Sequence, residues 1–306
     1  MITAARSELK GVFSIGNNKR LHRDIQLLIT RAKQVGLVNE FGNQKILLND
    51  KSFDILSRIS KFLIWINENE TPNLRTFYET KKLIDDLLFC ILNGETYMVF
   101  AFLCPSYKKG IGAIGFNREI GETTKRGIKI TNTVYKLLKS LGVAVKCQII
   151  FSDLVIENYD KIFELGLLSG MKSNIESTRL FTQATDPEIF FNKLSEFSEI
   201  TEIMPLKGID NIPNRISNST YQLVLKRNIN FYKSQFGWED KQIIERTNIL
   251  ACSYPVLGDF FRAKFSRFLF VYTANSLERA KMYQGEQYQL NSIAIFYPRK
   301  IKFSRK

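Results

Sequence analysis

Three segments in the middle of the chain combine continuous and periodic patterns of apolar residues. Residues 96–104 (TYMVFAFLC) are almost all apolar and rich in β-formers, and Pro105 ends the run, as expected for a strand buried on both faces. Residues 128–141 carry apolar side chains at helical spacing, and residues 143–151 (VAVKCQIIF) form a second apolar run. This order predicts a βαβ unit with parallel strands and a right-handed crossover.

The first ninety residues have the spacing of amphipathic helices. Residues 24–38 and 50–67 repeat apolar side chains every three or four positions, which predicts two helices. A third helix is predicted to begin at Thr71-Pro72, because proline is favoured in the first turn, and to end before Gly94. We therefore predict a helical N-terminal section over 1–93. The pattern leaves open whether it is a separate domain or covers one face of the sheet.

The remainder of the chain predicts more α/β structure. Asp186-Pro187-Glu188 has the signature of a helix start, with aspartate as the cap and proline at the first helical position. Residues 202–218 contain two prolines and a glycine and predict a linker or a long loop. The other expected elements are helices over 157–168, 219–236, 239–250 and 275–283, and strands over 268–273 and 292–297.

Together these elements predict an α/β fold. We expect a Rossmann-like core with a mostly parallel sheet over 94–206. A basic α/β C-terminal section over 207–306 is expected to pack on the same sheet.

Positive charge gathers in two places. The net charge of the chain is +14. Residues 207–306 carry 17 basic and 7 acidic residues, and residues 106–146 carry 9 basic and 2 acidic residues. A concentrated positive field attracts phosphates, so the partner is expected to be an anionic small molecule or RNA. Good solubility alone is the alternative explanation.

The chain lacks the residues or motifs that several common enzyme chemistries require. The chain has one histidine, His22, and four widely spaced cysteines that form no C-x-x-C pair, so a His/Cys metal site is not predicted. Neither the P-loop pattern nor the G-x-S-x-G elbow occurs. No apolar run approaches the roughly 18 residues of a membrane span, and the first residues do not resemble a signal peptide. We therefore expect a cytoplasmic protein with cysteines as structural thiols. No cofactor is indicated.

A glycine-rich segment follows the first predicted strand. Gly110, Gly112 and Gly115 form a G-x-G-x-x-G pattern, in which backbone N–H groups can approach a phosphate closely. The predicted helix begins only about ten residues later, whereas the dinucleotide-binding fingerprint opens a helix at once. NAD binding is therefore not favoured, and the alternatives are a long substrate loop or a purely structural loop.

The ends of the two central strands provide the candidate site. Ligands of open parallel sheets bind beyond the carboxyl ends of the strands. At these ends we expect Lys108 or Lys109 to neutralise an anionic substrate and Asp153 to bind an amine or a ribose hydroxyl. A loop that contains Arg118, Glu119 and Glu122 is expected to cover them. The predicted catalytic residues are Asp153, Lys108, Tyr107, Glu119 and Glu122, and the predicted binding residues are Ser106, Lys109, Gly110, Gly112, Gly115, Arg118 and Ser152.

A second candidate lies near the C-terminus. Residues 252–267 mix aromatic and basic side chains, a combination suited to phosphate binding with base stacking. The alternative is a loop followed by an amphipathic helix. The residues concerned are Tyr254, Asp259, Arg262 and Lys264.

Residues 96–160 resemble the isocyanide (isonitrile) synthase family, which includes dityrosine-biosynthesis proteins. The resemblance lies in an apolar strand that ends at Pro105-Ser106 with Lys108 close by, an acidic loop with Glu119 and Glu122, a helix, and a strand that closes on Asp153. It implies a Rossmann-like enzyme that converts an amino-acid amine to an isonitrile with a pentulose phosphate.

Three functional hypotheses follow from the sequence. The first is a transferase-like enzyme that acts on an amino acid, a nucleotide or a phosphorylated small molecule. The second is an RNA-dependent or tRNA/RNA-binding protein that uses the basic C-terminal third. The third is a non-catalytic interaction protein, which the missing catalytic motifs leave open. The sequence does not indicate an oligomeric state.

Overall fold

The fold of the chain was described from a computed structural model. It describes residues 19–37, 39–41, 45–47, 50–69, 74–77, 80–105, 115–157, 168–203, 218–274 and 292–296. Statements below about residues that are absent or unpaired refer to these ranges.

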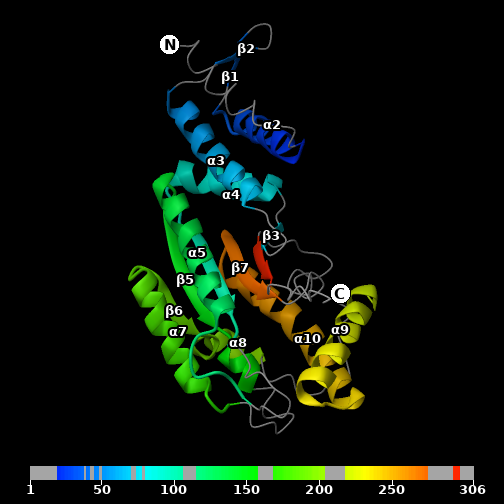
Figure 1. Ribbon diagram of the computed structural model, residues 1–306. Coiled ribbons are helices and arrows are strands. Elements are labelled where there is room, and N and C mark those ends of the chain that lie inside the picture. The colour runs from blue at the N-terminus through cyan, green and yellow to red at the C-terminus, as the bar shows by residue number, and fades with distance from the viewer. Residues whose placement is uncertain are drawn as a thin grey trace, which may run out of the picture.

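A six-stranded sheet forms the centre of the molecule (Figure 1). Its strand order is β3-β8-β7-β4-β5-β6, and all neighbouring pairs are parallel except β3 with β8. A separate two-stranded ribbon lies near the N-terminus, formed by β1 (Asn39–Phe41) and β2 (Lys45–Leu47). The strands of the main sheet are β3 (Leu74–Phe77), β4 (Tyr97–Leu103), β5 (Val145–Phe151), β6 (Phe190–Lys193), β7 (Phe268–Ala274) and β8 (Ser292–Phe296).

The central strand β4 is apolar because it is covered on both faces. Alternate side chains of a strand point to opposite faces. Val99, Ala101 and Leu103 join one hydrophobic core, and Phe100 and Phe102 join the other. The sheet therefore separates two packed layers of helices, which confirms the predicted α/β class with a mostly parallel sheet.

The first layer contains the crossover helix between β4 and β5. This helix, α5 (Glu122–Ser140), buries Ile128, Val134 and Leu138 against the sheet. The N-terminal helices extend the same core at one end of the molecule (Figure 1). The other helices of this layer are α2 (Lys19–Gln34), α3 (Asp50–Glu68), α4 (Thr80–Asn93) and, beside α5, α7 (Met171–Thr185).

The second layer is rich in aromatic rings. The helix α10 (Asp240–Lys264) places Phe261 against Phe100 and Phe270, with ring centroids 4.8 and 5.3 Å apart. The helix α9 (Asn218–Phe236) packs on α10, and α8 (Ser198–Ile203) follows the short 3₁₀ turn Leu194–Glu196. Helices on both faces make the fold doubly wound.

The start of the third predicted helix was wrong. Residues 74–77 form β3, an antiparallel edge strand, and the helix α4 begins only at Thr80. Leu74 and Phe77 fit a helical spacing, but they pair with Ile295 and Ser292 of β8. The section over 1–93 is therefore not purely helical. All three predicted sections contribute strands to one sheet.

The predicted helix start at Asp186-Pro187-Glu188 was also wrong. Asp186 follows the last residue of α7 in an extended conformation, and β6 begins at Phe190. The Asp186 carboxylate accepts a hydrogen bond from the Glu188 N–H at 3.0 Å. This contact, made two residues along the chain, is the Asx turn that competes with a helix cap in the same sequence pattern.

The alternative considered for residues 252–267, a loop followed by an amphipathic helix, was wrong about the loop, because the first half of this segment is helical. The helix α10 continues through Pro255 to Lys264 because Leu257, Phe260 and Phe261 are buried in the aromatic layer. The predictions at 219–236, 268–273 and 292–297 are confirmed with shifts of one residue, and the helix predicted over 239–250 is confirmed but continues to Lys264. The predicted helix over 275–283 and most of the elements over 157–168 and 202–218 lie outside the described residues.

Candidate functional site

The strand order defines where a ligand site is expected. Along the chain β4, β5 and β6 are laid down in one direction from β4, and β7 and β8 in the other. This is the Rossmann order 3-2-1-4-5, in which the switch point lies between the first and fourth strands. Here those strands are β4 and β7 (Figure 1). The candidate site is therefore the carboxyl edge of the sheet around the ends of β4, β5 and β7.

At the end of β5, the Asp153 carboxylate is held by Ser195. Its Oδ1 accepts the Ser195 N–H at 3.1 Å, and its Oδ2 accepts the Ser195 hydroxyl at 2.5 Å. Asp153 is 2% exposed and begins a short helical turn over 153–157. Since Ser195 lies two residues after β6, in the turn Leu194–Glu196, this carboxylate fastens the ends of β5 and β6 together. The sequence pattern located Asp153 at the sheet edge, but it did not identify Ser195 as its partner.

The neighbouring Ser152 differs from Asp153. It is fully buried, and its Oγ has no hydrogen-bond partner among the described residues. Its backbone N–H donates to the Leu103 carbonyl at 3.0 Å, which places it beside the end of β4. A buried hydroxyl without a partner costs about 1–3 kcal/mol unless water or a ligand satisfies it.

At the end of β4, Cys104 lies next to Ser152 in the parallel register. Leu103 pairs with Phe151, so the following residues are neighbours. None of the four cysteines forms a disulfide, and Cys104 is partly exposed whereas Cys90, Cys147 and Cys252 are buried. The Cys104 carbonyl accepts the Thr124 hydroxyl at 3.3 Å, so the first turn of α5 touches this strand end.

The first turn of α5 faces this edge without a side-chain cap. Gly121 is the N-cap residue, and no side-chain hydrogen bond caps the start of the helix. Uncapped N–H groups and the helix dipole favour a negative group here. The prediction that Glu122 lies in a covering loop was wrong, because it is the first residue of α5. Its carboxylate is exposed and bonds to Lys125 at 2.8 Å, which lowers the pKa of Glu122.

The segment before α5 is fastened to the start of α7. The Phe116 N–H donates to the Ser169 carbonyl at 2.9 Å, and the Asn174 amide donates to two carbonyls at 2.9 and 2.8 Å. Gly115 has a φ of 95°, and a Cβ there would lie 2.8 Å from the Ser169 oxygen. This glycine is therefore needed for close packing against Ser169. In the same segment, Arg118 and Glu119 are exposed.

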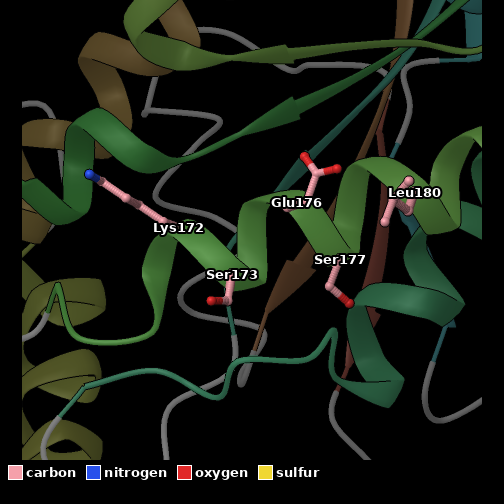
Figure 2. Close-up of a pocket in the computed structure, with 5 residues that line it drawn as sticks. All are labelled: Lys172, Ser173, Glu176, Ser177 and Leu180. Atoms are coloured by element: carbon pink, nitrogen blue, oxygen red, sulfur yellow. The ribbon is translucent and has the colours of Figure 1, made fainter.

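An open depression of about 550 Å³ lies on the outer face of α7. Figure 2 shows its side chains, with Glu176 and Ser177 on different sides of the helix. Glu176 pairs with Arg179, and Ser177 accepts the Ile120 N–H at 3.1 Å. No set of buried polar groups converges there, so this depression is not a built site. Its lining consists of Lys172, Ser173, Glu176, Ser177 and Leu180.

The second predicted cluster is spread along α10. Tyr254 and Lys264 are separated by ten helical residues, which corresponds to about 15 Å. Arg262 pairs with Asp259, and Lys264 pairs with Glu199 at 2.5 Å and lies over the Phe197 ring. The four residues do not converge on one point. The predicted residues Ser106, Tyr107, Lys108, Lys109, Gly110 and Gly112 lie outside the described residues.

No group of three or more His, Cys, Asp and Glu side chains that could hold a metal ion occurs in the described ranges. Within those ranges, no helix is both long enough and apolar enough to cross a membrane.

The strand order and the site at its switch point define a Rossmann-type α/β protein. No protein-family model and no curated protein matches the chain. Among solved structures, it is similar to the PvcA protein from Pseudomonas aeruginosa, with a TM-score of 0.48 and 9% identity over 88% of this chain and 83% of that chain. It is also similar to a Mycobacterium tuberculosis protein whose structure relates cyclodipeptide synthetases to type I tRNA synthetases. There the TM-score is 0.37 and the identity 14%, over 72% of this chain and 90% of that chain.

Proposed function

We propose that the chain is a transferase-like enzyme that binds an anionic small molecule at the carboxyl edge between β4 and β7. The observation that carries the proposal is the buried Ser152 hydroxyl at the carboxyl edge of the sheet, beside the end of β4, which has no partner among the described residues. The uncapped first turn of α5 supports it, because such a turn favours a phosphate or a carboxylate. An amino acid, a nucleotide or another phosphorylated compound would satisfy these groups.

The roles of the residues follow from their contacts. Ser152 would bond to the substrate directly, and the first turn of α5 would hold its negative group. Asp153 would act as a positioning residue, because both of its carboxylate oxygens already bond to Ser195. The resemblance to isocyanide synthases narrows the proposed substrates to an amino-acid amine and a pentulose phosphate.

Cys104 allows the site to be tested before the reaction is known. It is partly exposed, whereas burial raises the pKa of Cys90 to about 11 and of Cys147 to about 12. Thiolates are the reactive form, so N-ethylmaleimide at neutral pH is expected to label Cys104 first. Mass spectrometry measures the rate of labelling with and without added amino acids, nucleotides and sugar phosphates, including a pentulose phosphate.

We expect one of these classes to slow the labelling of Cys104, and Ser152→Ala to remove that protection. In Cys104→Ser, the same compound should still raise the melting temperature, which shows that the thiol reports on binding. The proposal fails if no compound protects Cys104, or if protection is identical in Ser152→Ala. Tight RNA binding without small-molecule binding would favour the RNA alternative, and a stable protein partner alone would favour the non-catalytic one.

A further inference from the structure

Cys104 differs from the other three cysteines in its surroundings. It is partly exposed at the end of β4, whereas Cys90, Cys147 and Cys252 are buried. Burial also raises the pKa of each of these three thiols. A buried, protonated thiol reacts slowly with reagents in solution. Cys104 is therefore the cysteine that a small molecule can reach and modify in the folded chain.

The surroundings of Cys104 favour negative charge. The Thr124 hydroxyl in the first turn of α5 donates to the Cys104 carbonyl at 3.3 Å, so this helix begins beside the cysteine. No side-chain hydrogen bond caps the start of α5, which carries the positive end of the helix dipole. The first eight residues of α5 contain three basic side chains and one acidic side chain, which are Lys125, Arg126, Lys129 and Glu122. Such a field attracts an anionic reactant.

A buried hydroxyl beside Cys104 is an independent sign of a ligand. Ser152 follows β5 where Cys104 follows β4, and its N–H donates to the Leu103 carbonyl at 3.0 Å. The Ser152 side chain is fully buried, and its Oγ has no hydrogen-bond partner among the described residues. An unsatisfied hydroxyl gains free energy when it donates to an anion. A negative group that binds at this strand end would supply that partner.

Two of the buried cysteines lie too far away to form a disulfide with Cys104. Cys147 pairs in the sheet with Val99, which lies five residues before Cys104 and thus about 16 Å along the strand. Cys90 lies near Arg267 at the opposite, amino edge of the sheet. A protein disulfide requires Cα atoms within about 7 Å. A small disulfide from solution has no such requirement, because it needs only an accessible thiol.

We propose that Cys104 is a site of reversible modification by an anionic low-molecular-weight disulfide. The Cys104 thiolate attacks one sulfur of the reagent, the S–S bond of the reagent breaks, and the leaving thiolate takes up the proton that Cys104 lost. Cys104 is oxidised to a mixed disulfide while half of the reagent is reduced to a thiol, so no other oxidant is needed. The start of α5 binds a carboxylate of the attached half. That the attached group excludes a substrate from the carboxyl edge rests on the function proposed above.

The test compares two small disulfides of opposite charge on the full chain, anionic glutathione disulfide and cationic cystamine. Peptide mass spectrometry measures the rate at which each modifies Cys104. We expect the ratio of the two rates to favour glutathione disulfide about threefold or more in the folded chain, relative to the same ratio in the urea-unfolded chain. High salt should reduce this preference because it screens the field, and dithiothreitol should restore the thiol.

Three variants connect the rate to the surroundings of Cys104. Ser152→Ala should slow the reaction with glutathione disulfide about threefold, because it removes the hydroxyl donor. Glu122→Gln should speed it about twofold, because it removes the acidic side chain from the first turn of α5. The matched control is Glu188→Gln. Glu188 also pairs with a lysine of α5, Lys139, at 2.5 Å, but this lysine lies about 21 Å along the helix from Lys125. The control should react at the wild-type rate.

The proposal is overturned if Cys104 stays unmodified in the folded chain while the unfolded chain reacts, or if folding does not change the preference for the anionic reagent. An intramolecular disulfide between Cys104 and Cys252 in place of the mixed disulfide would also overturn it. The mixed disulfide should abolish the rise in melting temperature that a protecting compound causes, and a rise that persists overturns the control of the substrate. If Cys104 is modified as expected but no compound stabilises the unmodified chain, the modification site stands and the proposed function fails.

Discussion

The two edges of the central strands β4, β5 and β7 differ in how their polar side chains are paired. At the amino ends, Arg267 pairs with Glu95 at 2.9 Å, approaches Asp86 at 4.0 Å and lies over the Phe89 ring at 3.6 Å. At the carboxyl ends, the described polar groups are hydroxyls and the Asp153 carboxylate, and Ser195 satisfies that carboxylate without a cation. One edge is closed by ion pairs, and the other contains the buried Ser152 hydroxyl, which has no partner among the described residues. The first arrangement stabilises the fold, and the second is the one that we propose for binding.

The largest predicted effect is at the amino edge. Arg267→Ala removes the ion pair with Glu95, the charge beside buried Asp86 and the cation–π contact with Phe89. We expect the free energy of unfolding to fall by about 3 kcal/mol, measured by urea denaturation. The control Arg179→Ala removes a surface pair with Glu176 and should cost less than about 0.5 kcal/mol. If the two variants lose equal free energy of unfolding, the Arg267 contacts at the amino edge contribute no more than an exposed surface ion pair.

The next prediction concerns the fastening of β5 to β6. Asp153→Ala removes both acceptors of Ser195 and should lower the free energy of unfolding by about 2 kcal/mol. Ser195→Ala should cost about 1 kcal/mol, and the double variant little more than Asp153→Ala, because the two residues share one interaction. Urea denaturation of the wild type, the two single variants and the double variant gives the coupling free energy between Asp153 and Ser195. Additive losses would show that Asp153 does not act through Ser195.

A smaller effect is expected from the pH dependence at Asp86. Burial raises the pKa of this carboxyl above 3.8, although Lys82 bonds to it at 2.7 Å and Arg267 lies nearby, both of which act in the opposite direction. An acid with a raised folded-state pKa costs stability once it ionises, so the cost appears as the pH rises through 3.8 and beyond. Relative to the wild type, Asp86→Asn should therefore gain about 1 kcal/mol or less between pH 4 and pH 7. A gain that shrinks with rising pH would contradict the assignment.

The central βαβ unit was predictable because each of its elements carries its own signal. Strand β4 within the run 96–104 and the last three residues of β5 are buried on both faces, and burial of that kind appears directly as continuous apolar sequence. Helix α5 shows its core face as a regular spacing. The elements that were predicted wrongly depend on distant partners. β3 exists because β8 pairs with it, and α10 passes through Pro255 because the aromatic layer of the sheet covers that stretch.

The candidate site shows the same limit. The position of Ser152-Asp153 at a strand end follows from the sequence alone. The partner of Asp153, Ser195, could not be predicted in the same way. Ser195 comes after the four-residue strand β6, and the Asp186-Pro187 pattern had predicted a helix there instead. The role of Gly115 also depended on a distant segment, since the atom that excludes a side chain there belongs to Ser169.

The smallest predicted effects separate the two edges most directly, because each edge contains one buried hydroxyl without a partner among the described residues. Tyr97 opens β4 at the amino edge and is fully buried, and burial raises its pKa well above 10.0. Tyr97→Phe removes that unsatisfied hydroxyl and should raise the free energy of unfolding by about 0.5 kcal/mol, with no effect on the labelling of Cys104. Ser152→Ala should likewise stay within about 0.5 kcal/mol of the wild type without ligand. With the protecting compound present, however, wild type and Tyr97→Phe should gain stability by mass action and Ser152→Ala should not. If both variants respond to the compound alike, the open hydroxyl at the carboxyl edge is a packing defect like its counterpart, and the site lies elsewhere.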